Sequence, residues 1–207
     1  MKTLKNTLVL SAALLGLFAT AAPASAQSIG WVVGINGSPK LTRAGHTKPV
    51  RRGNSVITGD LIETDDAAKI KLLFSDDSVM AIGPRSSVTI PEFTYKADNR
   101  VAKIKVLFGR FKINIAKFFG GPSDYEVTTP TAVAGVRGTI LWGDTDIDAI
   151  CSLEGEIEVR SLSAAEDAEA ARLTPGNCVA NMGQGETAPL VPSQEALQGY
   201  LKEVTLE

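Results

Sequence analysis

The sequence of 207 residues predicts an all-β fold that ends in one short helix. Apolar and polar residues alternate with period two through most of the chain, which is typical of strands with one buried face. Turn-forming residues separate these runs at short intervals, and an apolar stripe with helical spacing occurs only near the C-terminus. Many short strands at close spacing indicate a β-sandwich, a β-barrel or a β-solenoid.

The first 26 residues are typical of a secretory signal peptide. Lys2 and Lys5 form a positive start, an apolar core extends over residues 8–19, and Ala24-Ser25-Ala26 fits a small-residue cleavage site. The apolar run is shorter than a bilayer-spanning helix requires. We therefore expect cleavage after Ala26, a periplasmic or secreted protein, and no membrane-spanning segment in the mature chain.

Six segments carry the period-two alternation most clearly. In the first of them, Ile70 and Leu72 face one side and Lys71 faces the other. The parity of the pattern slips by one at Gly109, which predicts a turn or a bulge between two of the segments. The six segments are residues 68–74, 87–90, 102–108, 110–115, 146–151 and 156–160.

Clusters of Gly, Pro, Asp, Asn and Ser separate the predicted strands. Glycine adopts positive φ, proline fixes φ, and short polar side chains hydrogen-bond to the local backbone, so these residues favour turns. Their close spacing leaves room only for short strands. The predicted turns are residues 58–60, 75–78, 82–84, 119–122, 153–155 and 174–177.

Two later segments depart from the strand pattern. Residues 163–172 have high helix propensity but no apolar stripe, so we expect an exposed excursion there. Residues 193–203 are expected to form a short helix that starts at Pro192 and Ser193. Its apolar face is expected to pack on the β-domain, with docking of a partner as the alternative. That face consists of Ala196, Leu197, Tyr200, Leu201 and Val204.

The charge of the chain gives no argument for nucleic-acid or membrane binding. Without residues 1–26 the chain has 19 basic and 23 acidic residues, a formal net charge of −4. Seven basic residues nevertheless lie within residues 96–117, against one acid, Asp98. This stretch is either the solvated side of two strands, which we favour, or a polyanion-binding face. The candidate patch consists of Lys103, Lys105, Arg110 and Lys112.

Cys151 and Cys178 are the two cysteines of the chain. An exported protein meets oxidising conditions, so the natural expectation is a disulfide bond between them. Two buried free thiols are the alternative. The first cysteine shares the predicted inward face of its strand with Ala149, which predicts a bond between neighbouring strands.

Three segments with recognisable motifs follow one another in the middle of the chain. Residues 58–78 begin with Thr-Gly-Asp-Leu-Ile-Glu-Thr and end with a Ser-Asp-Asp-Ser turn, and residues 106–112 read Val-Leu-Phe-Gly-Arg-Phe-Lys. The third and most specific segment contains Thr129, Pro130, Arg137, Gly138 and Thr139. In order and spacing, over roughly residues 56–142, they resemble FecR-type domains, which are periplasmic or secreted modules best known from regulators of iron-uptake signalling.

This resemblance implies a short-stranded core of the β-solenoid or roll type, with a β-sandwich as the alternative. We expect a signal peptide at residues 1–26, a FecR-like β-domain at residues 27–190 and a helical tail at residues 191–207. The family usually has glycine where this chain has Asp77. That position is expected to need positive φ, which aspartate tolerates better than most residues.

The third motif is expected to have mainly structural roles. Pro130 fits the start or the edge of a strand, and Gly138 is expected to permit a close backbone approach. Arg137 stands among apolar neighbours, and a guanidinium buried there needs carbonyl or carboxylate acceptors. We favour this structural role for Arg137 over the alternative, binding of an anionic ligand.

The sequence offers little for catalysis or for a cofactor. His46 is the only histidine, and no nucleophile elbow or Gly-rich phosphate loop occurs. His46 and the two cysteines are too few for a typical zinc site. Asp144, Asp146 and Asp148 alternate, but they lack the EF-hand pattern, and we expect a solvent-facing acidic strip. We therefore expect no enzymatic activity, no metal and no cofactor.

The expected function is that of an exported, non-catalytic binding or sensing module of the FecR type, acting through another envelope protein. The family's best-known members are anti-sigma regulators with a cytosolic domain and a transmembrane helix, and the sequence given shows neither. The alternative function is that of a structural or polysaccharide-binding module that uses the basic strand face. No nucleic-acid partner is expected.

Overall fold

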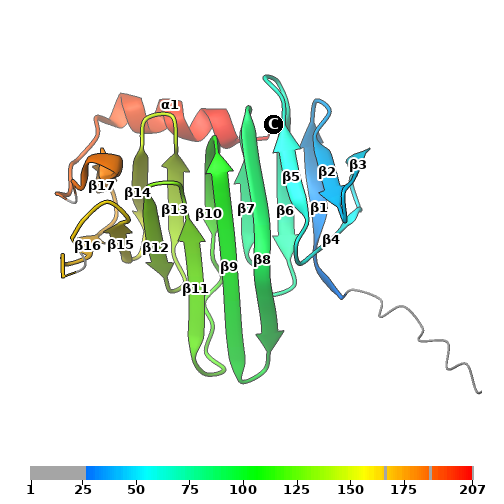
Figure 1. The fold of residues 1–207 in the computed structure, drawn as a ribbon, viewed down its shortest axis with the longest axis horizontal. Coiled ribbons are helices and arrows are strands. Elements are labelled where there is room, and N and C mark those ends of the chain that lie inside the picture. Colours follow the sequence, from blue (N-terminus) through cyan, green and yellow to red (C-terminus); the bar gives the residue numbers. More distant parts are fainter. Residues whose placement is uncertain (1–26, 166, 187, 207) are drawn as a thin grey trace, which may run out of the picture.

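The computed structural model describes residues 27–165, 167–186 and 188–206. They form two β-sheets and one short C-terminal helix, so the all-β prediction is confirmed (Figure 1). The signal peptide expected at residues 1–26 lies outside the described residues. Within the described residues, no helix is long and apolar enough to cross a bilayer.

The first sheet has eight strands. Its order is β17-β14-β13-β10-β7-β6-β1-β4. Their bounds are β1 (Ser28–Asn36), β4 (Ser55–Ile57), β6 (Lys69–Phe74), β7 (Val79–Ile82), β10 (Arg110–Asn114), β13 (Ile140–Asp144), β14 (Ala149–Glu154) and β17 (Cys178–Ala180).

The second sheet has nine strands. Its order is β16-β15-β12-β11-β9-β8-β5-β2-β3. Their bounds are β2 (Lys40–Arg43), β3 (His46–Pro49), β5 (Leu61–Thr64), β8 (Ser86–Lys96), β9 (Asn99–Phe108), β11 (Ser123–Thr128), β12 (Ala132–Val136), β15 (Ile157–Ser161) and β16 (Ala171–Leu173).

The chain advances along both sheets in nearly the order of the sequence. It starts at the end with β1 to β4 and finishes at the end with β14 to β17, as the colours of Figure 1 show. On the way it crosses repeatedly from one sheet to the other. The neighbouring strands pair antiparallel, except that β9 and β11 pair parallel. Strands that are close in the sequence are therefore close in space.

The inward faces of the two sheets share one apolar core. Ile70 and Leu72 of β6 are fully buried, and so is Val106 of β9, while Lys71 is exposed. These residues belong to one cluster of buried apolar side chains that draws on both sheets. The alternation in the sequence therefore identified the buried faces of β6 and β9 correctly. In the segment of residues 146–151 the predicted inward face is wrong, because Ile147 is 43% exposed and Ile150 points into this core.

Glycine makes a sharp crossing between the sheets possible at position 109. Gly109 joins β9 of the second sheet to β10 of the first with φ of +96°. A Cβ atom there would lie 2.5 Å from the carbonyl oxygen of Arg85, closer than such atoms approach. The parity slip in the sequence thus marks a change of sheet, and β9 and β10 do not pair with each other.

The C-terminal helix α1 (Gln194–Val204) lies over the outer face of the first sheet. The Oγ of Ser193 accepts a hydrogen bond from the Ala196 amide at 3.1 Å and caps the first turn, as the sequence predicted. The ring of Tyr200 stacks on that of Trp142 with centroids 4.4 Å apart. This second, smaller apolar cluster also contains Val204 and both cysteines.

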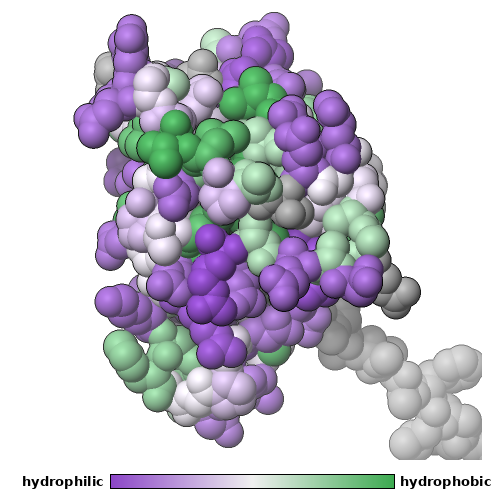
Figure 2. All heavy atoms as spheres, turned by 90° about the vertical axis from the view of Figure 1, so that its left-hand side faces the viewer, coloured by the Kyte–Doolittle hydropathy of each residue, from purple (hydrophilic) through white to green (hydrophobic). Residues whose placement is uncertain are grey.

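The excursion after β15 has no helix among its described residues. Strand β16 occupies residues 171–173 instead, and the short 3-10 helix η1 (Met182–Gln184) follows β17. The face of the molecule at this end is mostly hydrophilic, with separate apolar areas between the polar side chains (Figure 2). High helix propensity without an apolar stripe did not suffice to make a helix here.

Candidate functional site

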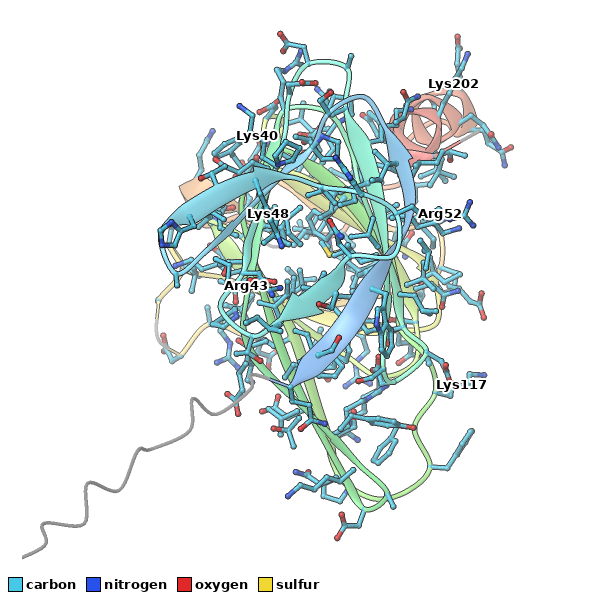
Figure 3. All side chains as sticks on the ribbon, turned by 90° about the vertical axis from the view of Figure 1, so that its right-hand side faces the viewer. Lys40, Arg43, Lys48, Arg52, Lys117 and Lys202 are labelled. Carbon is cyan, nitrogen blue, oxygen red and sulfur yellow. A yellow bond between two sulfur atoms is a disulfide. The ribbon has the colours of Figure 1, made fainter. Side chains whose placement is uncertain are left out.

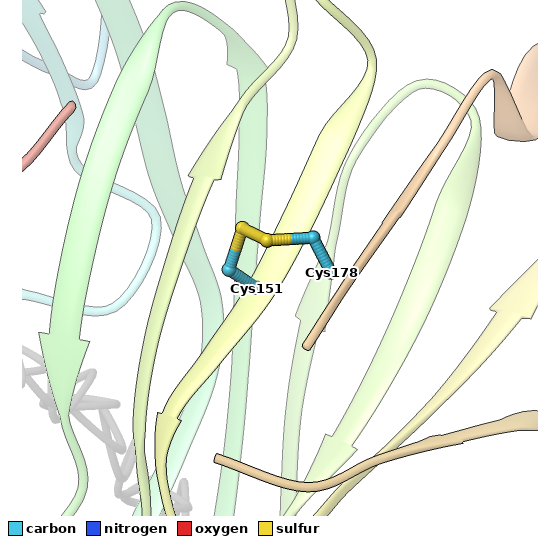
Figure 4. Close-up of a disulfide and its surroundings, with 2 residues drawn as sticks. All are labelled: Cys151 and Cys178. Carbon is cyan, nitrogen blue, oxygen red and sulfur yellow. A yellow bond between two sulfur atoms is a disulfide. The ribbon is translucent and has the colours of Figure 1, made fainter. Parts of the chain in front are cut away.

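Cys151 and Cys178 form a disulfide bond, as the sequence predicted (Figure 4). The two residues lie directly opposite each other on the neighbouring antiparallel strands β14 and β17. Cys178 exchanges its backbone hydrogen bonds with Leu190 on its other side. The cysteines are therefore a non-hydrogen-bonded pair, the arrangement that brings opposite side chains closest.

The candidate basic patch is split between the two sheets. Lys103 and Lys105 point outward from β9 in the second sheet, while Arg110 and Lys112 point outward from β10 in the first sheet. The outward faces of stacked sheets look in opposite directions. The structure therefore does not bring the four residues together.

Acidic neighbours also offset two of these cations. Lys103 contacts Glu126 and lies 2.7 Å from Asp124, and Arg110 lies 2.7 Å from Asp144. Burial lowers the pKa of Lys103, but its hydrogen bonds to the two carboxylates outweigh that effect and raise the pKa above its ordinary value. The local excess of positive charge is smaller than the sequence count implies.

In residues 58–78, the first of the three motif segments, Asp60 has a structural role. Its side chain is fully buried. Its carboxylate accepts two hydrogen bonds of 2.7 Å from Arg43 and one of 2.9 Å from the Ile57 amide. The paired carboxylate raises the pKa of Arg43. A bidentate pair of this kind fixes the turn between β4 and β5.

A buried ion pair joins the second part of that segment to a distant arginine. Asp76 in the β6–β7 turn lies 3.1 Å from Arg100 at the start of β9, and the two side chains are 0% and 1% exposed. The guanidinium also donates to the Ala116 carbonyl at 2.7 Å and lies 5.3 Å and 5.2 Å from the ring centres of Phe118 and Tyr125. The solvated position predicted for the basic stretch of residues 96–117 is therefore wrong for Arg100.

The Ser-Asp-Asp-Ser turn itself is closed by its own side chains. The Oγ of Ser78 donates to Asp76 at 2.8 Å and accepts from the Ala116 amide at 3.1 Å. Asp77 adopts φ of +65°, as expected for the position where the family has glycine. Thus the turn, the Arg100 pair and the segment at Ala116 form one hydrogen-bonded unit.

The Thr-Pro-Thr-Ala part of the third motif closes the turn between β11 and β12. The Oγ1 of Thr129 accepts from the Ala132 amide at 3.0 Å. Thr131 contacts Asp148, whose other oxygen accepts from the Gly183 amide at 2.6 Å. Pro130 stands in this turn just before β12, in keeping with the predicted strand start.

The expected acidic strip is not a strand face. Asp144 ends β13 and is 3% exposed, and Asp146 and Asp148 lie between β13 and β14. Asp144 and Asp146 pair with Arg110, so these carboxylates hold local structure. The three alternating aspartates therefore lie at the end of β13 and in the turn after it, and not along one face of a strand.

The Val-Arg-Gly-Thr part of the third motif forms another crossing between the sheets. Gly138 has φ of +63° and joins β12 to the residues before β13. A Cβ atom at Gly138 would lie 2.7 Å from Cγ of Lys117, so glycine permits the close approach that the sequence predicted. Thr139 is buried, and its carbonyl accepts from the Ile115 amide at 2.8 Å.

Arg137 is exposed, which corrects the expectation of a buried structural residue. Among the residues that the structure describes, no hydrogen bond or ion pair involves its side chain. The alternation of β12 explains this position, because Val136 points into the core and its successor points out. The Arg137 side chain is thus exposed to solvent.

A cavity of about 440 Å³ lies beside Arg137. Such a volume is within the range of about 300–1,000 Å³ typical of ligand-binding clefts. Its walls come from the start of β9, the loop before β11 and the crossing at Gly138. The lining residues are Asn99, Arg100, Lys117, Phe118, Phe119, Gly121, Pro122, Ser123, Asp124, Arg137 and Gly138.

The loop of residues 115–122 carries several of the exposed groups of this cavity. Figure 3 shows Lys117 pointing away from the sheets, and Phe119 is 90% exposed. The loop lies tightly on the β8–β9 turn, because a Cβ atom at Gly120 would be 1.9 Å from the Ala97 carbonyl oxygen. The sequence pattern predicts only a turn at Phe119. Two adjacent phenylalanines outside any alternation are the feature of the sequence that points to this exposed position.

A second hollow of about 550 Å³ adjoins the first on the outer face of the second sheet. Gly135 provides no side chain at its centre, and Arg137 lines both hollows. The opposite wall holds Glu158, which pairs with Arg172 at 3.0 Å. The charges of this hollow are therefore largely paired with one another.

The chain is similar to one protein family and to solved structures. Residues 60–160 match the model of the family described as FecR protein. No curated protein matches the chain.

Two crystal structures of a protein from Parabacteroides distasonis, provisionally assigned as an anti-sigma factor, share the fold. Their TM-scores are 0.53 and 0.52, with 18% and 19% sequence identity. The likeness covers 68% of this chain in both and 64% and 63% of the other chains, less than two thirds of their length. At this identity the likeness concerns the fold alone.

Proposed function

Because residues 60–160 form a FecR-type domain, we propose that this protein is an exported, non-catalytic module that senses or transmits a signal by binding another protein of the cell envelope. The family match supports a regulatory role. Fold likeness alone does not specify a partner, so the proposal depends on the surface that the domain presents.

The observation that carries the proposal is the cavity beside Arg137. It joins the one exposed charged residue of the third motif to Phe119, an aromatic side chain that is 90% exposed. Aromatic and arginine side chains dominate the energetics of protein interfaces. The other motif residues hold turns and crossings, which leaves this surface as the candidate for recognition.

Export is part of the same proposal. The chain begins with residues typical of a cleavable signal, and the described domain contains a disulfide, which persists in oxidising compartments. We place the protein in the periplasm or outside the cell, with cleavage after Ala26. Mass spectrometry of the exported protein should then give a chain that begins at Gln27.

A photo-crosslinking residue at position 119 tests the function in living cells. We expect a covalent adduct with one defined envelope protein, because Phe119 would be buried in the interface. The same residue at position 162 is the matched control, since Leu162 is also exposed but lies beside Thr131, at the opposite end of β11 from the Phe119 loop. An adduct from position 162 alone, or from neither position, would contradict the proposal.

The alternative function, polysaccharide binding by a basic strand face, has less support. Its four residues lie on two sheets, and acids pair with Lys103 and Arg110. A polyanion would have to displace these carboxylates or contact each face separately. A ligand in the cavity beside Arg137 would have to do neither.

A further inference from the structure

Two positively charged side chains that line the cavity beside Arg137 have no partner among the described residues. Neither Lys117 nor Arg137 has a hydrogen bond or ion pair with any residue that the structure describes, and both are exposed. The other charged liners are engaged, since Arg100 pairs with Asp76 and Asp124 pairs with Lys103. Within the described part of the chain, the cavity therefore presents two positive charges that no hydrogen bond or ion pair engages.

The fold brings the segments that carry these two cations together. The glycine at position 138 lets the stem of Lys117 approach its backbone, and Arg137 is the preceding residue. The two side chains come from segments 20 residues apart in the sequence, yet they line one cavity. An arginine fork binds the two oxygens of a carboxylate in parallel, and a lysine adds a point charge.

The same cavity has an apolar wall. Phe118, Phe119 and Pro122 line it, and the Phe118 ring is held between the Arg100 guanidinium at 5.3 Å and the Tyr95 ring at 6.0 Å. Contacts of Gly120 and Gly121 with the β8–β9 turn fix the loop further. The apolar surface beside Phe119 is therefore offered by a braced loop, which lowers the ordering cost of binding.

We propose that this cavity receives an acidic group carried next to an apolar side chain of the partner protein, with Arg137 and Lys117 binding the carboxylate and Phe118 and Phe119 packing on the side chain. This inference rests on the proposed function and specifies the chemistry of the partner. A small inorganic anion would satisfy the cations but leave Phe119 in water. An uncharged ring would cover Phe119 and leave the cations without a partner.

NMR titration of the purified protein with simple probes separates these elements. N-acetyl-phenylalanine carries both a carboxylate and a ring, N-acetyl-phenylalaninamide carries the ring alone, and acetate and inorganic phosphate carry charge alone. We expect the first to shift the amide signals of residues 117–119 and 137–138 at concentrations where the others do not. Equal binding of the amide, or of acetate or phosphate, would overturn the inference.

Variants of the two cations test the assignment further. Arg137→Gln should weaken binding of N-acetyl-phenylalanine by about tenfold or more, because a charge-assisted pair is lost. Arg137→Lys keeps the charge but not the fork and should retain part of the binding. Lys105→Gln, an exposed lysine on β9, is the matched control and should leave binding unchanged. An unaffected Arg137→Gln variant would assign the probe to another place.

The results distinguish this inference from the function on which it rests. If position 119 gives its adduct in cells but no probe binds at Arg137, the envelope-binding function stands and the carboxylate chemistry is wrong. If the probe binds at Arg137 but position 119 gives no adduct, the cavity chemistry stands and the protein-binding function is wrong.

Discussion

Arg100 and Arg137 show how differently two arginines of one chain are used. Arg100 is 1% exposed and meets a carboxylate, a carbonyl and two aromatic rings. Arg137 is exposed and meets none of these among the described residues. The roles expected from the sequence were the opposite. Both side chains follow the alternation of their strands, Arg100 inward like Ala102 and Arg137 outward after Val136, but the alternation does not reveal the distant acceptors that allow an arginine to be buried.

Removing the carboxylate of Asp76 should destabilise the protein strongly. Asp76→Ala leaves the buried Arg100 charge without its ion-pair partner, for which we expect a loss of about 3–5 kcal/mol. Chemical denaturation measures this loss. Asp66→Ala is the matched control, because Asp66 is exposed and lies 3.6 Å from Arg85, a pair worth about 1 kcal/mol or less. Similar losses in both variants would contradict the buried pair.

Removing the Arg137 side chain should leave stability almost unchanged. Arg137→Ala deletes an exposed group without described contacts, so the free energy of unfolding should change by no more than about 0.5 kcal/mol. Thermal and chemical melting measure it. A larger loss would return Arg137 to the structural role that its apolar neighbours suggest in the sequence.

Tyr125 should make the protein sensitive to alkali. Burial, with a further contribution from the charge of Asp76, raises the pKa of its phenol. The unfolded state then loses this proton first, so its contribution to stability is complete below about pH 10 and is lost as the pH rises beyond it. Tyr125→Phe should reduce the slope of unfolding free energy between about pH 9 and 11. Tyr95→Phe, at an exposed tyrosine, should not.

At the scale of elements, the strands were predictable and their assignment to sheets was not. Period-two alternation located β6, β9 and β10 because each has one buried face. The parity slip at Gly109 has the same appearance whether the chain makes a hairpin or crosses to another sheet. Only tertiary packing decides between a hairpin and a crossing. The same choice decides whether the basic patch lies on one sheet or is divided between two.

The disulfide should stabilise the last strands of the first sheet. Its cysteines are 27 residues apart, and a closed loop of that size contributes roughly 3–4 kcal/mol. Replacing both cysteines with alanine should lower the denaturation midpoint accordingly. Reductant should lower the midpoint of the unmodified protein and leave that of the double variant unchanged. A midpoint insensitive to reductant would argue against the bond.

At the scale of the whole molecule, the lysines of the candidate basic patch are divided between two opposite surfaces. Lys105 and Lys112 belong to the outer faces of different sheets, and residues 27–207 carry a formal net charge of −4. We therefore expect weak retention on a heparin column at physiological salt, where screening acts over about 8 Å. Lys105→Glu combined with Lys112→Glu should change the elution salt little. Strong retention abolished by this pair would revive the polysaccharide-binding function.

The advance of the chain along both sheets also gives the molecule two unequal ends. One end is closed by the covalent bond between β14 and β17, while the other ends in the three-residue strand β4 and in β3, whose four residues are all exposed. A molecule in which each strand contacts mainly its neighbours opens locally from its weakest edge. Backbone amides of β2 to β4 should exchange with deuterium before those of β13 and β14. Strands β2 to β4 would then open first, and the strands next to the disulfide would stay folded longest.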